Sequence, residues 1–119
     1  MIDAAKLTEE QLEEMVEAFS SVKECDEVCL NLFIKSKWSL HKTVEWAKSD
    51  KLYVKRAAFM IMVGLARQDM QMQNFVFRVF IPILKRESVD QRPEIQEAIT
   101  WAFEAIAERH KDFEKREEK

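Results

Sequence analysis

A basic pair, Lys55 and Arg56, directly precedes an apolar run. That run, residues 57–66, is apolar on every side, which predicts a helix surrounded by other helices. Asp50 lies just upstream and is a candidate N-cap for this helix. Arginine presents a planar fork of hydrogen-bond donors to an anionic partner. We therefore expect any functional site of this chain to include the entry of its buried helix.

Asp26 and Trp101 are the other residues whose types could serve a site. An aspartate on a helix surface is most often solvated or ion-paired, and Arg56 can be paired with Asp26 or Glu27 if their helices stack side by side. Trp46 and Trp101 occur at helical spacing among apolar neighbours, which favours core positions over a ligand-binding wall. The residue types alone leave both interpretations of each residue open.

Other chemistries find little support. Cys25 and Cys29 are four residues apart, on one face of a predicted helix, which favours two small buried side chains over a two-ligand metal site or a redox pair. His41 and His110 lie far apart, without acids or cysteines at ligand spacing, so we expect no metal site. The only glycine, Gly64, favours close helix packing and no phosphate-binding loop. We expect no cofactor.

Composition indicates one all-α domain. The chain has 119 residues, of which 47% are hydrophobic, and only two are proline. Turn-forming residues are thus too few for hairpins of strands, whereas strong helix formers are abundant. The N-terminus lacks a leader-like apolar block, and no uncharged stretch approaches the length needed to span a membrane. We expect a cytoplasmic protein that does not associate with membranes.

Charge is distributed unevenly although the net charge is only −3. Residues 1–50 contain eleven acidic and six basic residues, residues 51–92 contain three and eight, and residues 93–119 contain eight and five. The middle third is therefore basic. Such a block forms a solvated face more often than a track for phosphates, and both interpretations stay open.

Helical periodicity and capping signals predict six helices. Thr8 with Gln11 fits a capping box, and Ser21 with Glu24 repeats the signal. Pro82 inside the fifth helix should bend it or remove a hydrogen bond. In the third helix we expect Leu40, Val44 and Trp46 to face inward. The predicted helices cover about residues 8–19, 21–36, 39–48, 50–68, 71–86 and 90–109.

Short connections make these helices three consecutive hairpins. The hairpins are predicted to stack as a HEAT-like α-solenoid, with an up-and-down six-helix bundle as the competing architecture. Residues 1–110 would form this single domain, and residues 111–119 a charged tail that frays or is disordered. In a stack, the second, fourth and sixth helices form one layer, which carries Asp26, Arg56 and Trp101 at similar height.

Four blocks in this order resemble the bacterial DNA alkylation repair family of HEAT-like-repeat DNA glycosylases. The similarity covers about residues 22–110, and four separated blocks in register are more specific than any one of them. The blocks are Cys25-Asp26-Glu27-Val28-Cys29-Leu30-Asn31-Leu32-Phe33, Trp46-Ala47-Lys48-Ser49, Val54-Lys55-Arg56-Ala57-Ala58-Phe59 and Ala98-Ile99-Thr100-Trp101-Ala102-Phe103-Glu104.

The resemblance implies a solenoid that cradles duplex DNA and hydrolyses the N-glycosidic bond of cationic alkylated purines without a metal and without flipping the base into a pocket. By motif position, Asp26 would be the catalytic acid that orients water and stabilises an oxocarbenium-like sugar. Arg56, with Lys55 beside it, would bind DNA, holding the backbone near the lesion. Trp101 would line the cleft and contact the cationic base.

The chain also departs from the family pattern. Val22 stands where an aromatic residue usually precedes the acid, Pro93 and Glu94 replace expected aromatics, and Glu104 replaces an arginine. Members also usually carry further N-terminal repeats that grip the duplex. A second hypothesis is therefore a non-catalytic helical-repeat module that binds a protein partner or forms a homodimer.

Overall fold

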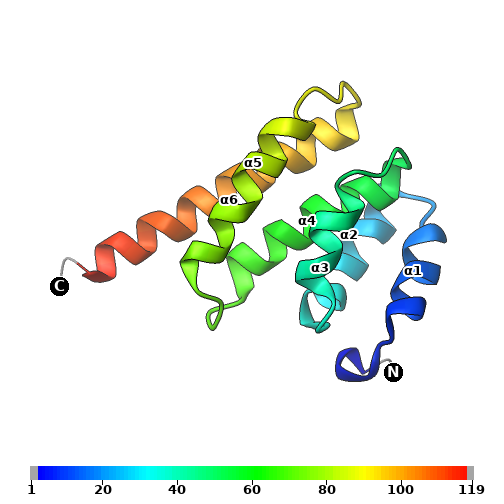
Figure 1. The fold of residues 1–119 in the computed structure, drawn as a ribbon, viewed down its shortest axis with the longest axis horizontal. Helices are drawn as coiled ribbons and strands as arrows, with labels where there is room; N and C mark the ends of the chain where they lie inside the picture. The colour runs from blue at the N-terminus through cyan, green and yellow to red at the C-terminus, as the bar shows by residue number, and fades with distance from the viewer. Residues whose placement is uncertain (1–2, 118–119) are drawn as a thin grey trace.

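The described residues 3–117 form helices joined by turns and loops, without strands, and side chains are described as far as Lys111 (Figure 1). The computed structural model has six α-helices and three short 3-10 turns in this range. Their bounds are η1 Ala4–Lys6, α1 Glu9–Glu17, α2 Val22–Asn31, η2 Phe33–Lys35, α3 Ser39–Trp46, α4 Leu52–Gln68, η3 Asn74–Val76, α5 Phe77–Glu87 and α6 Pro93–Glu117.

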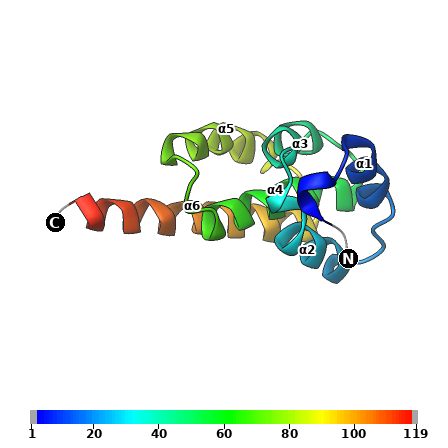
Figure 2. The same ribbon diagram turned by 90° about the horizontal axis from the view of Figure 1, so that it is seen from below.

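The six helices form three hairpins arranged in two layers. Figure 2 shows α1, α3 and α5 in one layer and α2, α4 and α6 in the other. Each hairpin contributes one helix to each layer, so the hairpins stack side by side as in an α-solenoid. The predicted all-α, solenoid-like fold of three hairpins is thus confirmed for residues 3–117. Helix α4 lies between α2 and α6, with which it makes its most extensive helix–helix contacts.

Helix α4 is the centre of the core. Every residue of α4 from Val54 to Ala66 is buried, including all of the apolar run, as predicted. Gly64 lets α2 and the turn that follows it approach α4 closely. A Cβ atom at this position would lie 2.6 Å from Cγ2 of Ile34 and 3.2 Å from Cδ2 of Leu30. The expected role of Gly64 in close helix packing is confirmed.

The capping signals of the first two helices are confirmed in outline. Thr8 and Gln11 form a full capping box at the start of α1. Ser21 accepts a hydrogen bond from the backbone N–H of Glu24 at 3.1 Å. The Glu24 carboxylate, however, accepts from the N–H of Ser20, one residue before the cap. In the second box, the side-chain acceptor of Glu24 therefore pairs with the residue before the N-cap instead of with the N-cap itself. Both caps satisfy N–H groups that have no partner within the helix.

Several predicted boundaries were wrong. Helix α2 ends at Asn31, and a 3-10 turn covers part of the stretch that was expected to continue the helix. The N-cap of α4 is Lys51 instead of Asp50. Helix α5 begins only at Phe77, after a loop and a 3-10 turn. Helix α6 continues to Glu117, so the expected charged tail at residues 111–119 begins inside a helix, and its last two residues lie outside the described part.

The inward face of α3 was predicted correctly only for Trp46. Leu40 and Val44 are exposed, whereas Lys42, Thr43 and Trp46 are buried. Lys42 reaches α1 and lies 2.6 Å from Oε1 of Glu13, and the indole N–H of Trp46 donates to the same oxygen at 3.0 Å. A buried ammonium needs such partners. The carboxylates of α1 therefore determine which face of α3 turns inward.

Candidate functional site

Asp26 and Arg56 form a bidentate ion pair between neighbouring helices of one layer. Nε of Arg56 donates to Oδ1 of Asp26 at 2.9 Å, and Nη2 donates to Oδ2 at 2.8 Å. The Arg56 side chain is 0% exposed, and that of Asp26 is 19% exposed. The ion pair expected from stacked helices is confirmed. Two parallel charge-assisted hydrogen bonds fix the carboxylate in both position and orientation.

Helix α6 completes the surroundings of Arg56. Nη1 donates to the backbone carbonyl of Glu94 at 2.6 Å, and Nη2 lies 3.0 Å from Oε1 of Glu97. The guanidinium carbon lies 5.4 Å from the centre of the Trp101 ring. Residues from α2, α4 and α6 thus meet at one guanidinium. We call Asp26, Arg56, Glu97 and Trp101 the Arg56 cluster.

The electrostatics of the Arg56 cluster favour the charged form of Arg56. Burial by itself would lower the pKa of Arg56, but the hydrogen bonds and negative charges of Asp26 and Glu97 outweigh it and raise the pKa above its ordinary value. Arg56 therefore stays cationic at any physiological pH. Its charge is balanced by one largely buried carboxylate and by Glu97, whose side chain is 47% exposed.

Lys55 lies apart from the Arg56 cluster. Its side chain is 9% exposed and binds Oε1 of Glu87 at 2.8 Å and Oδ2 of Asp90 at 2.9 Å, at the end of the α5–α6 hairpin. Arg92 also binds Asp90, at 2.7 Å. The two residues of the basic pair therefore hold different neighbours: Arg56 joins α2 and α6 to α4, and Lys55 joins the α5–α6 connection to α4.

Sequence patterns did not single out Glu97. The available signal was its position on α6 four residues before Trp101, because residues at this spacing share a helix face. An acid on that face is placed to meet the arginine of the neighbouring helix. Glu94 was noted only as a departure from the family pattern, yet its backbone carbonyl is a ligand of Arg56. A backbone acceptor is independent of side-chain type, so its role could not be read from residue identity.

The family model described as DNA alkylation repair enzyme matches residues 2–116. The chain belongs to this family. The resemblance seen in the four sequence blocks is thus confirmed, and it extends over nearly the whole chain. No curated protein and no solved structure gave a match. A role in DNA alkylation repair therefore follows from the family model, together with the residues that the chain shares with the family.

The family residues meet at one place in this DNA alkylation repair fold. The structure brings together Asp26, Arg56 and Trp101, with the Trp101 ring partly exposed beside the guanidinium. At the positions that depart from the family, Val22 is the first residue of α2 and partly buried, Pro93 is the exposed first residue of α6, and Glu104 is exposed. The cluster is therefore bordered by acids and lacks additional aromatic walls at these positions.

The described residues lack a metal-binding cluster and a membrane-spanning helix. They hold no group of three or more histidine, cysteine or acidic residues that could bind a metal ion. None of the helices in the described range is long and apolar enough to cross a membrane. Cys25 and Cys29, both free and buried, lie beside carbonyls of α4, with Sγ of Cys25 at 3.5 Å from O of Tyr53. Burial comes first among the causes that raise the pKa of Cys29, which keeps it a thiol.

Proposed function

We propose that this protein binds alkylated duplex DNA at the Arg56 cluster and excises cationic alkylated purines. The observation that carries the proposal is a partly exposed carboxylate, Asp26, locked in one orientation by a fully buried arginine on a fold of the DNA alkylation repair family. A fixed carboxylate next to developing positive charge stabilises it without first having to reorient.

The reaction would proceed by cleavage of the bond between C1′ of the sugar and the ring nitrogen of the base. The bonding electron pair moves to the cationic base, which leaves as a neutral molecule, and positive charge develops on the sugar as an oxocarbenium ion. The Asp26 carboxylate stabilises that charge. A water molecule then adds to C1′ and gives up a proton, which the carboxylate can accept. This scheme needs one carboxylate and no metal.

Arg56 and Trp101 would support this chemistry from either side of Asp26. Arg56 positions the carboxylate through the two hydrogen bonds that it donates to Oδ1 and Oδ2. The partly exposed indole of Trp101 would contact the cationic base through its ring. The contacts with the DNA backbone that the family motif implies for Arg56 and Lys55 stay predictions. The ion pairs of both side chains give each of them a structural role as well.

The test is excision from duplex DNA that contains N7-methylguanine. We expect the wild-type protein to release the modified base and Asp26→Asn to reduce release to background. Glu27→Gln is the matched control, because it removes an adjacent exposed carboxylate and should leave the rate nearly unchanged. Thermal unfolding of each variant separates lost chemistry from lost fold. Equal rates for wild type and Asp26→Asn would contradict a catalytic role for Asp26.

A second candidate is a non-catalytic module that binds a protein partner or a second copy of the chain. The observation that favours it is the acidic border of the cluster, since Glu97 and Glu104 are exposed where phosphates would approach. Exposed apolar residues, among them Leu40, Val44 and Val79, offer surface for such contacts. No excision and no salt-dependent binding to duplex DNA, together with a dimer in solution, would favour this function over the first.

A further inference from the structure

A groove with a volume of about 770 Å³ opens at the end of the molecule where α4 ends. Its walls come from the last residues of α4, the α4–α5 loop, the start of α5 and α6. Arg67, Met70, Phe75, Arg78, Glu108 and Arg109 are among the residues that line it. Arg56 precedes the first groove residues by ten positions of α4, which is about 15 Å along the helix. The groove is therefore distinct from the Arg56 cluster, and we call it the loop groove.

Arg109 of α6 holds together the elements that form the walls of the loop groove. Its guanidinium donates to the backbone carbonyls of Ala66 at 3.2 Å and Asp69 at 2.6 Å, and to Oδ1 of Asn74 at 2.7 Å. The guanidinium carbon also lies 4.4 Å from the centre of the Phe77 ring. One arginine of α6 thus caps the carbonyl end of α4 and holds the loop beyond it. The walls are fixed by these contacts.

Two other arginines of the loop groove have no partner in the described part of the chain. Arg67 and Arg78 are exposed, and neither makes a hydrogen bond or an ion pair there. Most cations of the basic middle third are bound to acids. Lys51, Lys55, Arg56, Arg86 and Arg92 each form at least one ion pair. Three cations of this segment make no ion pair in the described range. Arg67 and Arg78 line the loop groove, where Glu108 is the acid beside them, and Lys85 lies farther along α5, outside the groove.

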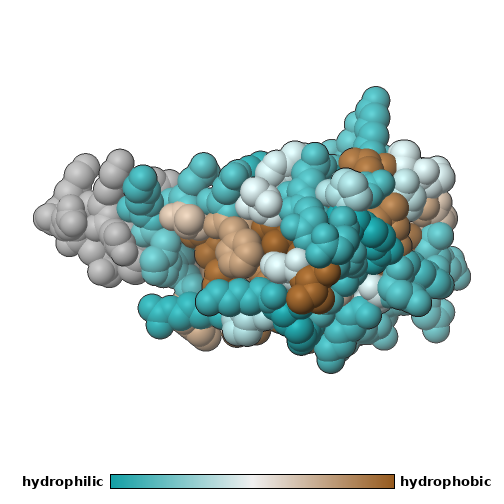
Figure 3. Space-filling model, turned by 90° about the horizontal axis from the view of Figure 1, so that it is seen from above, coloured by the Kyte–Doolittle hydropathy of each residue, from teal (hydrophilic) through white to brown (hydrophobic). Residues whose placement is uncertain are grey.

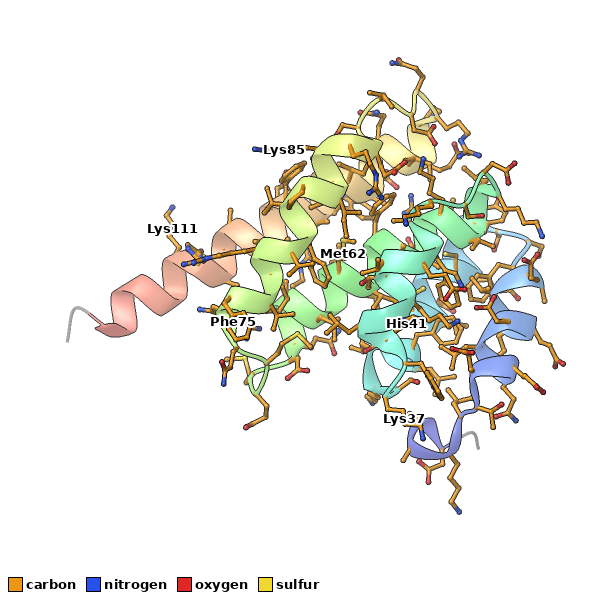
Figure 4. All side chains as sticks on the ribbon, viewed as in Figure 1. Lys37, His41, Met62, Phe75, Lys85 and Lys111 are labelled. Carbon is orange, nitrogen blue, oxygen red and sulfur yellow. The ribbon has the colours of Figure 1, made fainter. Side chains whose placement is uncertain are left out.

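Exposed apolar side chains border these arginines. Phe75 is 61% exposed and Met70 is 63% exposed. Figure 4 shows Phe75 at the loop end of α5, with Lys85 farther along the same helix. A separate apolar area, brown and enclosed by teal polar side chains, lies on the side seen from above, away from the α4–α5 loop at the bottom of Figure 1 (Figure 3). An exposed aromatic ring beside arginines can stack on an unpaired base while the guanidinium groups bind the phosphates on either side of it.

We propose that the loop groove binds a single strand of DNA. Two unpaired arginines complement the phosphates, and Phe75 offers a stacking face that bases inside a duplex cannot use. Membership of a DNA repair family favours nucleic acid over an acidic protein as the source of the anion. The proposal goes beyond binding and excision at the Arg56 cluster, because its residues lie elsewhere and need no alkylated base.

The test is the fluorescence anisotropy of a labelled twelve-nucleotide oligothymidine, titrated at several salt concentrations. The double variant Arg67→Gln/Arg78→Gln should reduce the slope of log affinity against log salt by about 1.4, since each phosphate contact with a single strand contributes about 0.7. Lys35→Gln/Lys48→Gln removes two exposed cations outside the groove and should leave the slope unchanged. Phe75→Ala should weaken binding by about tenfold without changing the slope.

Other outcomes would overturn the proposal. An unchanged affinity in Phe75→Ala would exclude stacking, and a duplex that binds as tightly as the single strand would exclude strand selectivity. Tighter binding of a polyglutamate peptide would indicate an acidic protein partner, and a groove-dependent dimer would indicate a second copy. Asp26→Asn should retain single-strand binding, because Asp26 lies outside the loop groove. This variant separates the two proposals, since it should lose excision at the Arg56 cluster and keep single-strand binding at the loop groove.

Discussion

The guanidinium of Arg56 lies 5.4 Å from the centre of the Trp101 ring while it binds both carboxylate oxygens of Asp26. One buried side chain of α4 therefore sets the relative positions of a residue on α2 and a residue on α6. The cation also lies within the range at which an aromatic ring attracts it. A change at Arg56 will act on both neighbours at once, so stability and any activity of the cluster are coupled through it.

Arg56→Met should destabilise the protein by about 3 to 5 kcal/mol, because it leaves the Asp26 carboxylate largely buried without its partner. Asp26→Leu/Arg56→Met should be more stable than Arg56→Met alone, since the unpaired charge is removed as well. Urea unfolding followed by circular dichroism measures both differences. A cost below about 1 kcal/mol for the single variant would show that Asp26 regains full hydration when Arg56 is absent.

Stability should decrease in acid because of the ion pairs of Lys55. The hydrogen bond from Arg92 is the main cause that lowers the pKa of Asp90, and Lys55 adds to it. Burial would raise the pKa of Glu87, but the hydrogen bonds from Lys55 and Arg86 lower it overall. Groups with a lowered pKa in the folded state stabilise the protein above their unfolded pKa values. That contribution is lost as the pH falls from about 4.5 through the lowered values.

Asp90→Asn is therefore expected to unfold more easily at pH 7 and to lose less stability between about pH 4.5 and pH 2 than the wild type does. Glu104→Gln removes an exposed acid from the same chain and should retain the wild-type pH profile. Thermal unfolding over this pH range measures both variants. Parallel profiles for Asp90→Asn and the wild type would mean that the ion pairs of Asp90 with Arg92 and Lys55 contribute nothing to acid sensitivity.

Lys42→Met should cost about 1 kcal/mol, less than Arg56→Met. The Lys42 side chain is only 2% exposed, but its partners Glu9, Glu13 and Glu45 are 45%, 38% and 47% exposed. These acids can turn into water when the ammonium is removed, and methionine fills the space of the lysine stem. Burial would lower the pKa of Lys42, yet the hydrogen bonds that it donates to Glu13 and Glu45 raise the pKa overall. Urea unfolding at pH 7 measures the loss of stability in both variants. Equal losses for Lys42→Met and Arg56→Met would contradict this argument.

The central helix and its ion pair could be predicted from sequence because their signals are local. An all-apolar run must be buried wherever it lies. Stacked hairpins bring Arg56 within reach of Asp26 or Glu27, and the structure shows that Asp26 is the partner. Helix α3 shows the opposite case. Its eight residues fit more than one inward stripe, and the apolar stripe through Leu40 and Val44 is the one that faces solvent. Only the position of the α1 carboxylates decides in favour of Lys42.

The roles of Arg109 and Glu97 could not be predicted from the sequence, because they too depend on how neighbouring helices are placed. The carbonyl end of α4 and its loop need donors, but which arginine reaches them depends on how α6 crosses α4. The catalytic and DNA-binding roles of Asp26, Arg56, Lys55 and Trp101 came from the family resemblance and stay predictions. Geometry adds that Lys55 is engaged in ion pairs with Glu87 and Asp90, which no motif could reveal.

Gly64→Ala tests the close packing between α4 and the α2 hairpin. Alanine favours helix by about 1 kcal/mol over glycine, but its methyl group would lie 2.6 Å from Cγ2 of Ile34. That atom is attached to a branched Cβ and cannot rotate away easily. We expect a net loss of about 1 to 2 kcal/mol from overpacking.

Gly64→Ala/Ile34→Ala provides the matched measurement for this contact. Ile34→Ala alone should destabilise the protein by removing apolar contacts with the core. If the clash with Cγ2 is the cause of the loss at Gly64, adding Gly64→Ala to Ile34→Ala should cost nothing or should stabilise, because the space is then free and only the helix preference of alanine remains. An equal loss from Gly64→Ala in both backgrounds, measured by urea unfolding, would assign the effect of the substitution to a neighbour other than Ile34.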